Sequence, residues 1–388
     1  MVHAEVQGLF RLSGVSATGP DSYQDDGSGT FRYTGTDLVL SQAVITGDFD
    51  LGADFSFHGV ANGYSDGEQQ LGFTQAYIKY QPLMAGKAKV SAKAGFFYPA
   101  LSVENTDIGW LSSHYLTNSA INSWIGEELR TAGLELTVKL PGRQRRSPWS
   151  WQFNAAGFKA NDTLGALLTW RGFALHDRQS LNNDEVNFAP YPAVINPEIL
   201  NSPSWNQPFH EVDGKWGFYV GAQANYLRKF DIRYYYYDNL ADSNVVNDER
   251  LYAWRTKFHS LAARYMLGNG LELSAQFMHG DTMMGYKLVY ADYTAGFLSL
   301  TKTWQDHKFS ARIERYLVSE DELDMVPEDI NSSAGNALTL NWTYSVNEHV
   351  QIALEGTINK NRVGNRVTIG EDVEDTATLT QIAATYRF

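Results

Sequence analysis

Apolar side chains recur at every second position in many segments of this chain, with polar side chains between them. Leu338, Leu340 and Trp342 alternate with Thr339 and Asn341, and the same period resumes after the turn that follows. Successive side chains of a β-strand point to opposite faces of a sheet, so this period predicts a hairpin with one apolar face and one polar face. A chain made of such segments is expected to fold into sheet.

The alternation repeats along the chain, interrupted in turn by short turns and by longer polar connections. Outer-membrane strands need about ten residues with one face toward lipid and the other toward a polar interior. We therefore predict an all-β transmembrane antiparallel β-barrel with short periplasmic turns and long extracellular loops. Sixteen strands are expected, and an extra hairpin within residues 165–179 would make eighteen. The sixteen predicted strands are residues 3–13, 37–46, 51–60, 71–81, 89–98, 129–140, 149–159, 215–227, 231–239, 254–267, 271–281, 291–304, 308–317, 336–346, 350–359 and 376–388.

Composition agrees with a barrel and excludes several other classes. The 388 residues have a mean hydropathy of -0.34 and no apolar run near the ~18 residues of a transmembrane helix, which excludes a helical membrane protein. Aromatic residues of the kind that form interface girdles are abundant, with 22 Tyr, 20 Phe and 10 Trp. The net charge of -13 argues against a nucleic-acid partner, and the lack of cysteine excludes a disulfide framework. A soluble all-β protein stays open as an alternative, because period two alone does not exclude it.

The first predicted strand begins near residue 3, which leaves no room for an N-terminal plug domain. We expect residues 1–388 to form a single barrel domain. Sixteen strands leave an aqueous channel when loops do not fill the lumen.

The predicted inner face carries charges of both signs in nearly equal number, seven basic against six acidic. Rings of one sign select ions, so this balance predicts weak ion selectivity. The inward charges are Arg11, Lys79, Lys93, Lys139, Arg233, Arg264 and Arg312 against Glu5, Asp54, Glu135, Glu272, Glu314 and Glu355.

Two long connections, residues 99–128 and 160–214, are too rich in apolar and aromatic side chains to serve as solvent loops only. Both are longer than ~12–15 residues, and loops of such length are usually either functional or disordered. We expect residues 99–128 to fold into the lumen or, alternatively, to pack against a neighbouring subunit. Residues 160–214 are the second candidate for a constriction or a lid.

If residues 99–128 fold inward, their carboxylates should face basic wall residues across a narrow gap and create a transverse field. The candidates for the pore lining and constriction are Lys93, Glu104, Asp107, Glu127, Glu128, Arg130, Glu135, Arg171, Arg178, Arg233, Arg264, Arg312, Glu314 and Glu355.

Neither catalysis nor a cofactor or metal centre is expected. His114, His176 and His210 lie in loops, but no local nucleophile motif accompanies them. The six carboxylates between residues 318 and 335 lack the ligand order and glycine of a calcium loop. We interpret them as surface acidity that binds divalent cations loosely among lipopolysaccharide phosphates.

Several stretches resemble a known family. Gln381, Ala383, Tyr386 and Phe388 are similar to the closing strand of bacterial outer-membrane barrels, although that pattern usually has glycine at the position of Ala383. Residues 97–105 and 119–130, together with 170–178 and 252–256, resemble proteobacterial outer-membrane porins related to the phosphate-selective porin group. The resemblance implies a sixteen-stranded, trimeric channel. This chain lacks the family's ladders of Arg and Lys, so phosphate selectivity does not carry over.

The expected function is passive diffusion of small hydrophilic solutes or ions across the bacterial outer membrane. The alternative is a receptor, adhesin or scaffold barrel whose lumen is filled by loops. The expected partners are outer-membrane lipid and lipopolysaccharide, the solutes themselves and further copies of the chain in a homotrimer.

Overall fold

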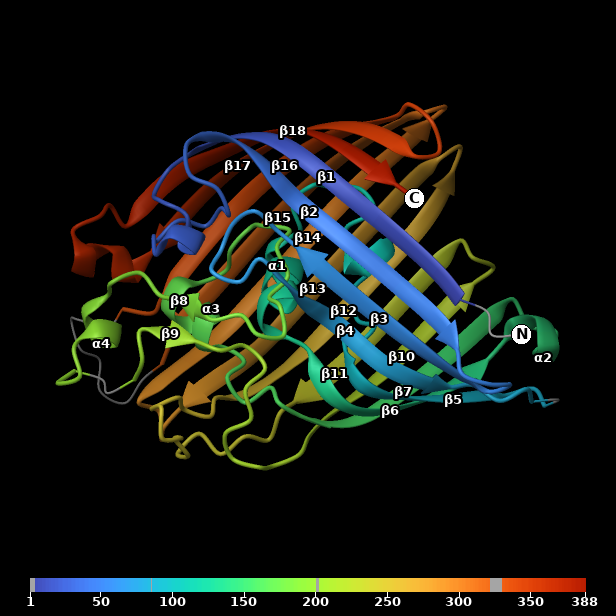
Figure 1. Cartoon of the computed structure of the whole chain (residues 1–388), viewed down its shortest axis with the longest axis horizontal. Coiled ribbons are helices and arrows are strands. Elements are labelled where there is room, and N and C mark those ends of the chain that lie inside the picture. Colours follow the sequence, from blue (N-terminus) through green and yellow to red (C-terminus); the bar gives the residue numbers. More distant parts are fainter. Residues whose placement is uncertain (1–3, 85, 200–201, 322–329) are drawn as a thin grey trace.

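The fold is one closed antiparallel barrel of sixteen strands in chain order, with β1 paired to β18. It was obtained as a computed structural model that describes residues 4–84, 86–199, 202–321 and 330–388. Figure 1 shows the strands tilted across the view, with long connections gathered at one end, here called the loop end, and short turns at the other, the turn end. The barrel strands are β1 Ala4–Thr18, β2 Thr36–Asp50, β3 Phe55–Gly63, β4 Leu71–Tyr80, β5 Lys89–Phe97, β6 Thr131–Leu140, β7 Trp149–Lys159, β10 Gly217–Tyr226, β11 Phe230–Asp238, β12 Arg255–Gly268, β13 Leu271–Met284, β14 Val289–Trp304, β15 His307–Glu320, β16 Ser333–Ser345, β17 Val350–Val363 and β18 Glu374–Arg387.

The remaining elements are short and lie in the connections. Helix α1 lies inside the barrel, whereas α3, α4 and the small β8–β9 sheet lie at the loop end (Figure 1). None of the described helices has the length and apolar character needed to cross a bilayer. These elements are η1 Tyr23–Asp25, η2 Ile108–Trp110, α1 Ala120–Glu128, α2 Gly142–Arg145, α3 Ala166–Arg171, β8 Val186–Asn187, α4 Pro192–Ile195, β9 Trp205–Asn206 and η3 Gly364–Ile369.

The prediction of a sixteen-stranded barrel is confirmed, and the eighteen-stranded alternative is wrong. Residues 165–179 contain helix α3 in place of a hairpin, because their apolar side chains pack inward around one helical turn. Several strands also extend further toward the loop end than predicted, so the connection between β13 and β14 shrinks to residues 285–288. Of the predicted acidic stretch 318–335, residues 322–329 lie outside the described residues.

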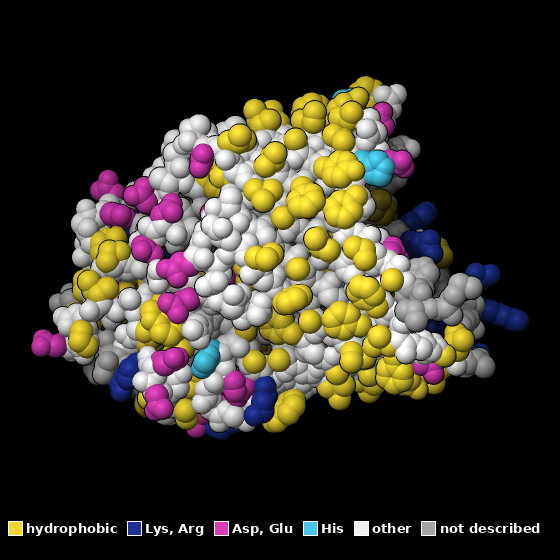
Figure 2. Space-filling view, viewed as in Figure 1, with side chains coloured by type: hydrophobic (Ala, Val, Ile, Leu, Met, Phe, Trp, Pro, Cys, Tyr) yellow, Lys and Arg dark blue, Asp and Glu magenta, His cyan; other side chains and the backbone are white. Residues whose placement is uncertain are grey.

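Side-chain facing follows the predicted alternation. Leu340 exposes 53% of its surface on the outside of the barrel, whereas its neighbour Thr339 is fully buried inside. Leu354 and Glu355 on β17 divide in the same way. Figure 2 shows apolar side chains spread over the outer surface of the strands, with Asp and Glu gathered at the loop end. The barrel thus has the apolar exterior and polar inner wall of an outer-membrane barrel.

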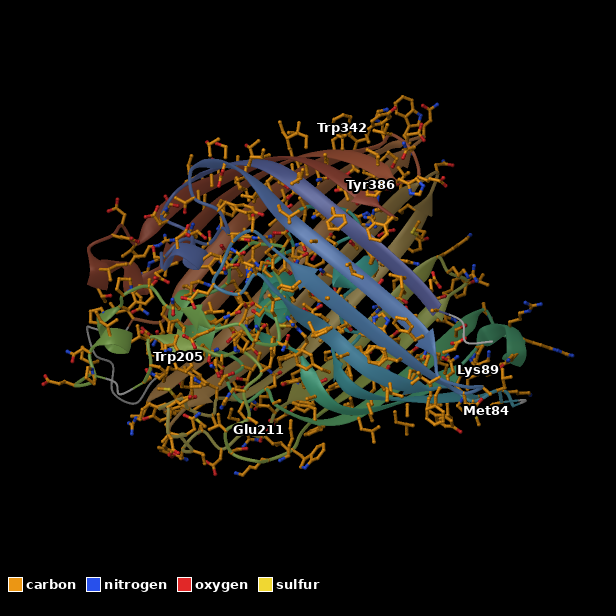
Figure 3. The ribbon with its side chains drawn as sticks, in the orientation of Figure 1. Met84, Lys89, Trp205, Glu211, Trp342 and Tyr386 are labelled. Carbon is orange, nitrogen blue, oxygen red and sulfur yellow. The ribbon has the colours of Figure 1, made fainter. Side chains whose placement is uncertain are left out.

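Aromatic side chains cluster at the turn end. The Trp342 ring stacks on His307 with ring centroids 6.0 Å apart, and Tyr386 lies 6.3 Å from Phe388. Figure 3 places Trp342 and Tyr386 at this end of the barrel wall. Such rings form the girdles that anchor barrels at a membrane–water interface.

We expect Leu340→Arg to lower the free energy of unfolding by ~2–4 kcal/mol, because the new charge faces lipid near the middle of β16. Gln152→Arg is the control, since Gln152 lies on the inner wall of a cavity of about 190 Å³ that also contains Asp231. Unfolding in urea with the protein refolded in lipid would measure both. Equal losses would contradict this register, because a slip of one residue reverses every side chain.

Candidate functional site in the barrel interior

Residues 98–130, between β5 and β6, run through the barrel and contact inner-wall side chains on opposite sides. Near its start, this 98–130 connection accepts a hydrogen bond at the Ser102 carbonyl from Arg233 on β11, with an N···O distance of 2.6 Å. Further along, the Tyr115 hydroxyl lies 2.7 Å from the Ser299 hydroxyl on β14. Helix η2 in the same connection contacts β1, β2 and β3. The connection therefore spans the interior.

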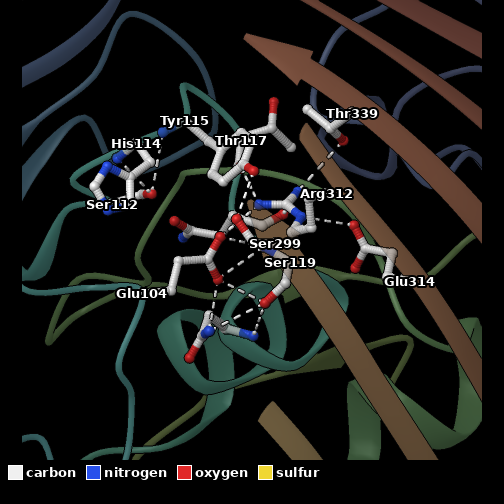
Figure 4. A network of polar contacts seen from close by, with 12 residues as sticks. Glu104, Ser112, His114, Tyr115, Thr117, Ser119, Ser299, Arg312, Glu314 and Thr339 are labelled. Carbon is white, nitrogen blue, oxygen red and sulfur yellow. Dashed lines mark hydrogen bonds and ion pairs between the residues drawn. The ribbon is translucent and has the colours of Figure 1, made fainter. Parts of the chain in front are cut away.

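Arg312 on β15 is the centre of the polar contacts between the 98–130 connection and the wall (Figure 4). Its guanidinium pairs with Glu104 of the connection and with Glu314 on its own strand, the latter at 3.0 Å. It also donates to the carbonyls of Thr117 and Asn118, each at 3.0 Å. Because Arg312 is fully buried, these acceptors replace the water that its charge would otherwise bind.

Two further wall carboxylates hold the backbone of the connection. Glu355 on β17 accepts from the N–H groups of Leu116 and Thr117 at 2.7 and 2.8 Å. Glu314 accepts from the Ala120 N–H at 2.6 Å, at the first residue of α1. Backbone N–H groups that would be orphaned inside the barrel are thus satisfied by charged acceptors, the stronger kind of hydrogen bond.

All nine residues of α1 are buried, and its Trp124 enters an aromatic cluster. The Trp124 ring lies 5.6 Å from Phe258 on β12, 5.2 Å from Tyr293 on β14 and 6.3 Å from Phe173. These edge-to-face contacts belong to an apolar core inside the barrel at the level of α1. The helix is therefore fixed by packing as well as by hydrogen bonds.

The last turn of α1 binds the 160–216 connection, which joins β7 to β10. Glu127 forms a two-point ion pair with Arg171, and His176 lies 3.6 Å from the same carboxylate. Glu128 accepts from Trp124 Nε1 at 2.6 Å and from the Leu167 N–H at 2.9 Å, near the start of α3. The two connections thus form one packed unit toward the loop end.

The two adjacent glutamates have opposite pKa shifts. Burial would raise the pKa of Glu127, but the neighbouring Arg171 and His176 lower it to about 2. Burial raises the pKa of Glu128 to about 7, although backbone N–H donors partly oppose the shift. Only Glu127 has a cationic partner close enough to offset the loss of water.

The other predicted site residues are dispersed. Lys93 pairs with Glu135 on the neighbouring strand at 3.2 Å, and Asp107 pairs with Arg387 at 2.6 Å. Arg264 lies on the inner side of β12, with no ion pair to a residue that the structure describes.

Two predicted arginines serve the long connections. Arg130 donates to the Ser180 carbonyl and lies against the Tyr98 ring, and Arg178 pairs with Asp184 at 3.2 Å.

The expected charges facing each other across a gap are not found at Glu104, because this carboxylate contacts Arg312 directly. Glu127 and Glu128 likewise face the 160–216 connection and not the wall, since Arg171 and α3 lie closer to them. Lys308 and Arg387, which were not predicted as site residues, also contact the 98–130 connection, from β15 and β18. Both residues occupy inward positions of the alternating pattern, and this position in the sequence could have identified them as wall residues that face the connection.

The loop histidines make varied contacts. His114 lies 3.1 Å from Glu272 on β13. The Ser123 hydroxyl bonds the backbone of His176, not its ring. Asp162, Glu211 and Asp213, which were not predicted as a group, bring carboxylate oxygens within 4.8 Å of one another.

A polar cavity of about 380 Å³ lies between the 98–130 connection and the inner wall, toward the turn end. Wall residues from β1, β15, β16, β17 and β18 line one side, and residues 106–107 and 112–116 line the other. Its charged lining residues include Arg11, Lys308 and Arg387. This is space inside the barrel that a small hydrophilic molecule could occupy.

Comparison with known proteins identifies the fold. No protein-family model matches the chain, and no curated protein sequence does. Among solved structures, the outer membrane channel DcaP of Acinetobacter baumannii has a TM-score of 0.60 at 9% identity, over 100% of this chain and 97% of that one. OmpT of Vibrio cholerae, in its trimer form, has a TM-score of 0.56 at 9% identity, over 100% and 99%. The anion-selective porin from Comamonas acidovorans has a TM-score of 0.55 at 11% identity, over 100% of both chains. The chain therefore shares its fold with outer-membrane channels and porins.

We expect Arg312→Met to lower the free energy of unfolding by ~3–5 kcal/mol, because it leaves Glu104 and Glu314 buried without their cation. Urea unfolding of the refolded protein measures the loss. The double variant Arg312→Met with Glu104→Gln should recover part of it. A single variant as stable as the wild type would contradict the central position given to this ion pair.

Glu128 should make stability fall as pH rises. The pKa of Glu128 is about 7 in the folded protein, against an ordinary value of 4.5. Between these two pH values the folded state binds a proton that the unfolded state has lost, so acid pH favours the folded state. Glu128→Gln should remove up to ~3 kcal/mol of the change in unfolding free energy with pH, since one pKa unit corresponds to ~1.4 kcal/mol. Thermal unfolding at pH 5 and pH 8 measures it. The opposite dependence of Glu127 falls between pH 2 and its ordinary pKa, outside this window. An unchanged slope in the variant would assign the pH dependence to other groups.

Proposed function

We propose that this protein is an outer-membrane channel for passive diffusion of small hydrophilic solutes, and that the 98–130 connection narrows its lumen. The observation that carries the proposal is the anchoring of this connection around the wall, by Arg233 on β11, by Arg312 on β15 and Glu355 on β17, and by the contacts of η2 with β1 on the side opposite β11. A segment held in this way sets the width of any passage. Six of the residues predicted from sequence as pore lining or constriction belong to this anchoring: Glu104, Asp107, Arg233, Arg312, Glu314 and Glu355.

The character of the wall supports diffusion of hydrophilic solutes. Inner-wall positions hold hydroxyl, amide and charged side chains, such as Thr343, Gln351 and Lys308 around the 380 Å³ cavity. Polar side chains can replace the hydration shell of a passing solute, whereas an apolar solute would have to displace bound water. Much of the interior charge is already paired, so we propose weak selectivity between cations and anions.

The exterior supports a membrane location with the expected partners. Apolar side chains cover the outside of the strands, and aromatic rings cluster at the turn end (Figures 2 and 3). We propose that outer-membrane lipid contacts this surface and that lipopolysaccharide lies against the acidic loop end through bridging divalent cations. The trimer form of the Vibrio cholerae OmpT structure supports a homotrimer.

A second candidate is a barrel that displays its loops as a receptor, adhesin or scaffold. It is favoured by the complete burial of α1 and by the ion pair between Glu127 and Arg171, which together fill the interior toward the loop end. In such a protein the 98–130 and 160–216 connections would be structural and would not open.

Single-channel recording in planar bilayers separates the two candidates. We expect the wild type to conduct and deletion of residues 105–123 to increase conductance, because the deletion removes η2 and the first half of α1 from the lumen. Deletion of residues 244–250, from the connection between β11 and β12, is the control. It shortens a loop-end connection without removing a wall partner of the 98–130 connection.

A wild type that conducts nothing, with a deletion variant that conducts, would support the loop-filled barrel. Unchanged conductance on deletion of residues 105–123 would place the constriction in the 160–216 connection. Heat-modifiable migration in detergent gels would verify that each variant is a folded barrel.

A further inference from the structure

We infer that the 380 Å³ cavity is a binding site for a small hydroxylated carboxylate, such as a sugar acid. The inference rests on the proposed function, because a solute reaches this cavity by entering the lumen. Beyond the proposed function, it assigns the solute a place in the barrel and a chemical class.

The charge of the cavity favours an anion. Arg11 of β1, Lys308 of β15 and Arg387 of β18 line it from adjoining parts of the wall. Among its described lining residues Asp107 is the only carboxylate, and Arg387 already binds it with N···O distances of 2.6 and 3.0 Å. The cavity therefore has a surplus of positive charge, in contrast to the net charge of the whole chain.

The Lys308 ammonium retains hydrogen-bonding capacity. Lys308 donates to the Ser113 carbonyl at 2.7 Å, and an ammonium carries three donors. Both terminal nitrogens of the Arg387 guanidinium donate to Asp107, and its Nε is buried, so Arg387 contributes charge to the cavity and no further donor. Arg11 is held from behind by Asp177 at 3.5 Å and donates to the Thr385 hydroxyl at 3.3 Å. The Lys308 ammonium could therefore donate to a carboxylate in this cavity without the separation of an existing ion pair.

The rest of the lining indicates a hydroxylated carbon skeleton. Hydroxyl groups come from both sides, with Thr106, Ser112 and Ser113 on the connection and Thr343 and Thr385 on the wall. Hydroxyls both donate and accept, which suits a polyol. The volume also lies within the range of small-molecule sites, ~300–1,000 Å³, and greatly exceeds what one inorganic oxyanion occupies.

Isothermal titration of gluconate into the detergent-purified barrel tests the site. Glucose supplies matched hydroxyls without the charge, and inorganic phosphate supplies charge without the skeleton. We expect gluconate to bind more tightly than phosphate, and phosphate more tightly than glucose. Lys308→Gln should weaken gluconate binding by about tenfold, the ~1.4 kcal/mol of one lost charged hydrogen bond. Lys139→Gln, which removes an inner-wall lysine outside this cavity, should leave binding unchanged.

The outcomes separate this inference from the proposed function. Equal binding of gluconate and glucose, or no effect of Lys308→Gln, would overturn the site even in a protein that conducts. Phosphate binding as tight as gluconate binding would overturn the assignment to a hydroxylated acid. Gluconate binding that depends on Lys308 in a protein without conductance would support the site and reject the diffusion channel.

Discussion

The closing of β1 against β18 is the constraint on which the rest of this structure depends. Lipid offers no hydrogen-bond partner, so each backbone N–H and C=O of the wall has to be satisfied within it, and an open edge is not tolerated. Gly8 exchanges two backbone hydrogen bonds with Phe388 at 3.0 and 3.1 Å. A Cβ at Gly8 would overlap the Phe388 ring, so glycine permits the ring to cover the seam. Once the seam is closed, every strand has one face toward lipid and one toward the lumen.

That division creates a second requirement inside the barrel. Inner-wall charges such as Arg312 and Glu355 need either water or protein partners. The 98–130 connection supplies such partners from its backbone, with carbonyls for Arg312 and N–H groups for Glu355. The wall in turn satisfies backbone N–H and carbonyl groups of the connection at Leu116, Thr117 and Ala120. Each therefore lowers the cost of burying the other, which explains how a largely irregular segment is held inside a barrel.

Sequence periodicity predicted the strands well because facing depends only on local alternation. Leu340 and Thr339 could be assigned to opposite faces from two adjacent letters. The interior contacts depend instead on which distant residues meet, and alternation carries no such information. Glu127 and Glu128 are chemically alike and adjacent, yet one meets Arg171 and the other meets backbone N–H groups of the 160–216 connection.

The prediction of an extra hairpin within residues 165–179 was wrong for a related reason. Its short apolar runs fit a strand as well as one helical turn, and packing around Trp170 selected the helix. Most of the charged residues of the candidate site were predicted from the sequence. Which of these residues pair with one another was not predicted, because partners such as Arg312 and Glu104 are separated by 208 positions along the chain.

The pairing also limits how a passage could widen. Moving the 98–130 connection as a whole would separate buried charges, and breaking one such pair costs ~3–5 kcal/mol. At the loop end the cost would be greater, because Glu127 couples this connection to the 160–216 connection. At the turn end the contacts of Lys308 and Arg387 border a polar cavity where water can replace a lost partner. Small displacements of residues 106–116 are therefore the least costly movement available, and the cavity is where the barrel can adjust to a solute.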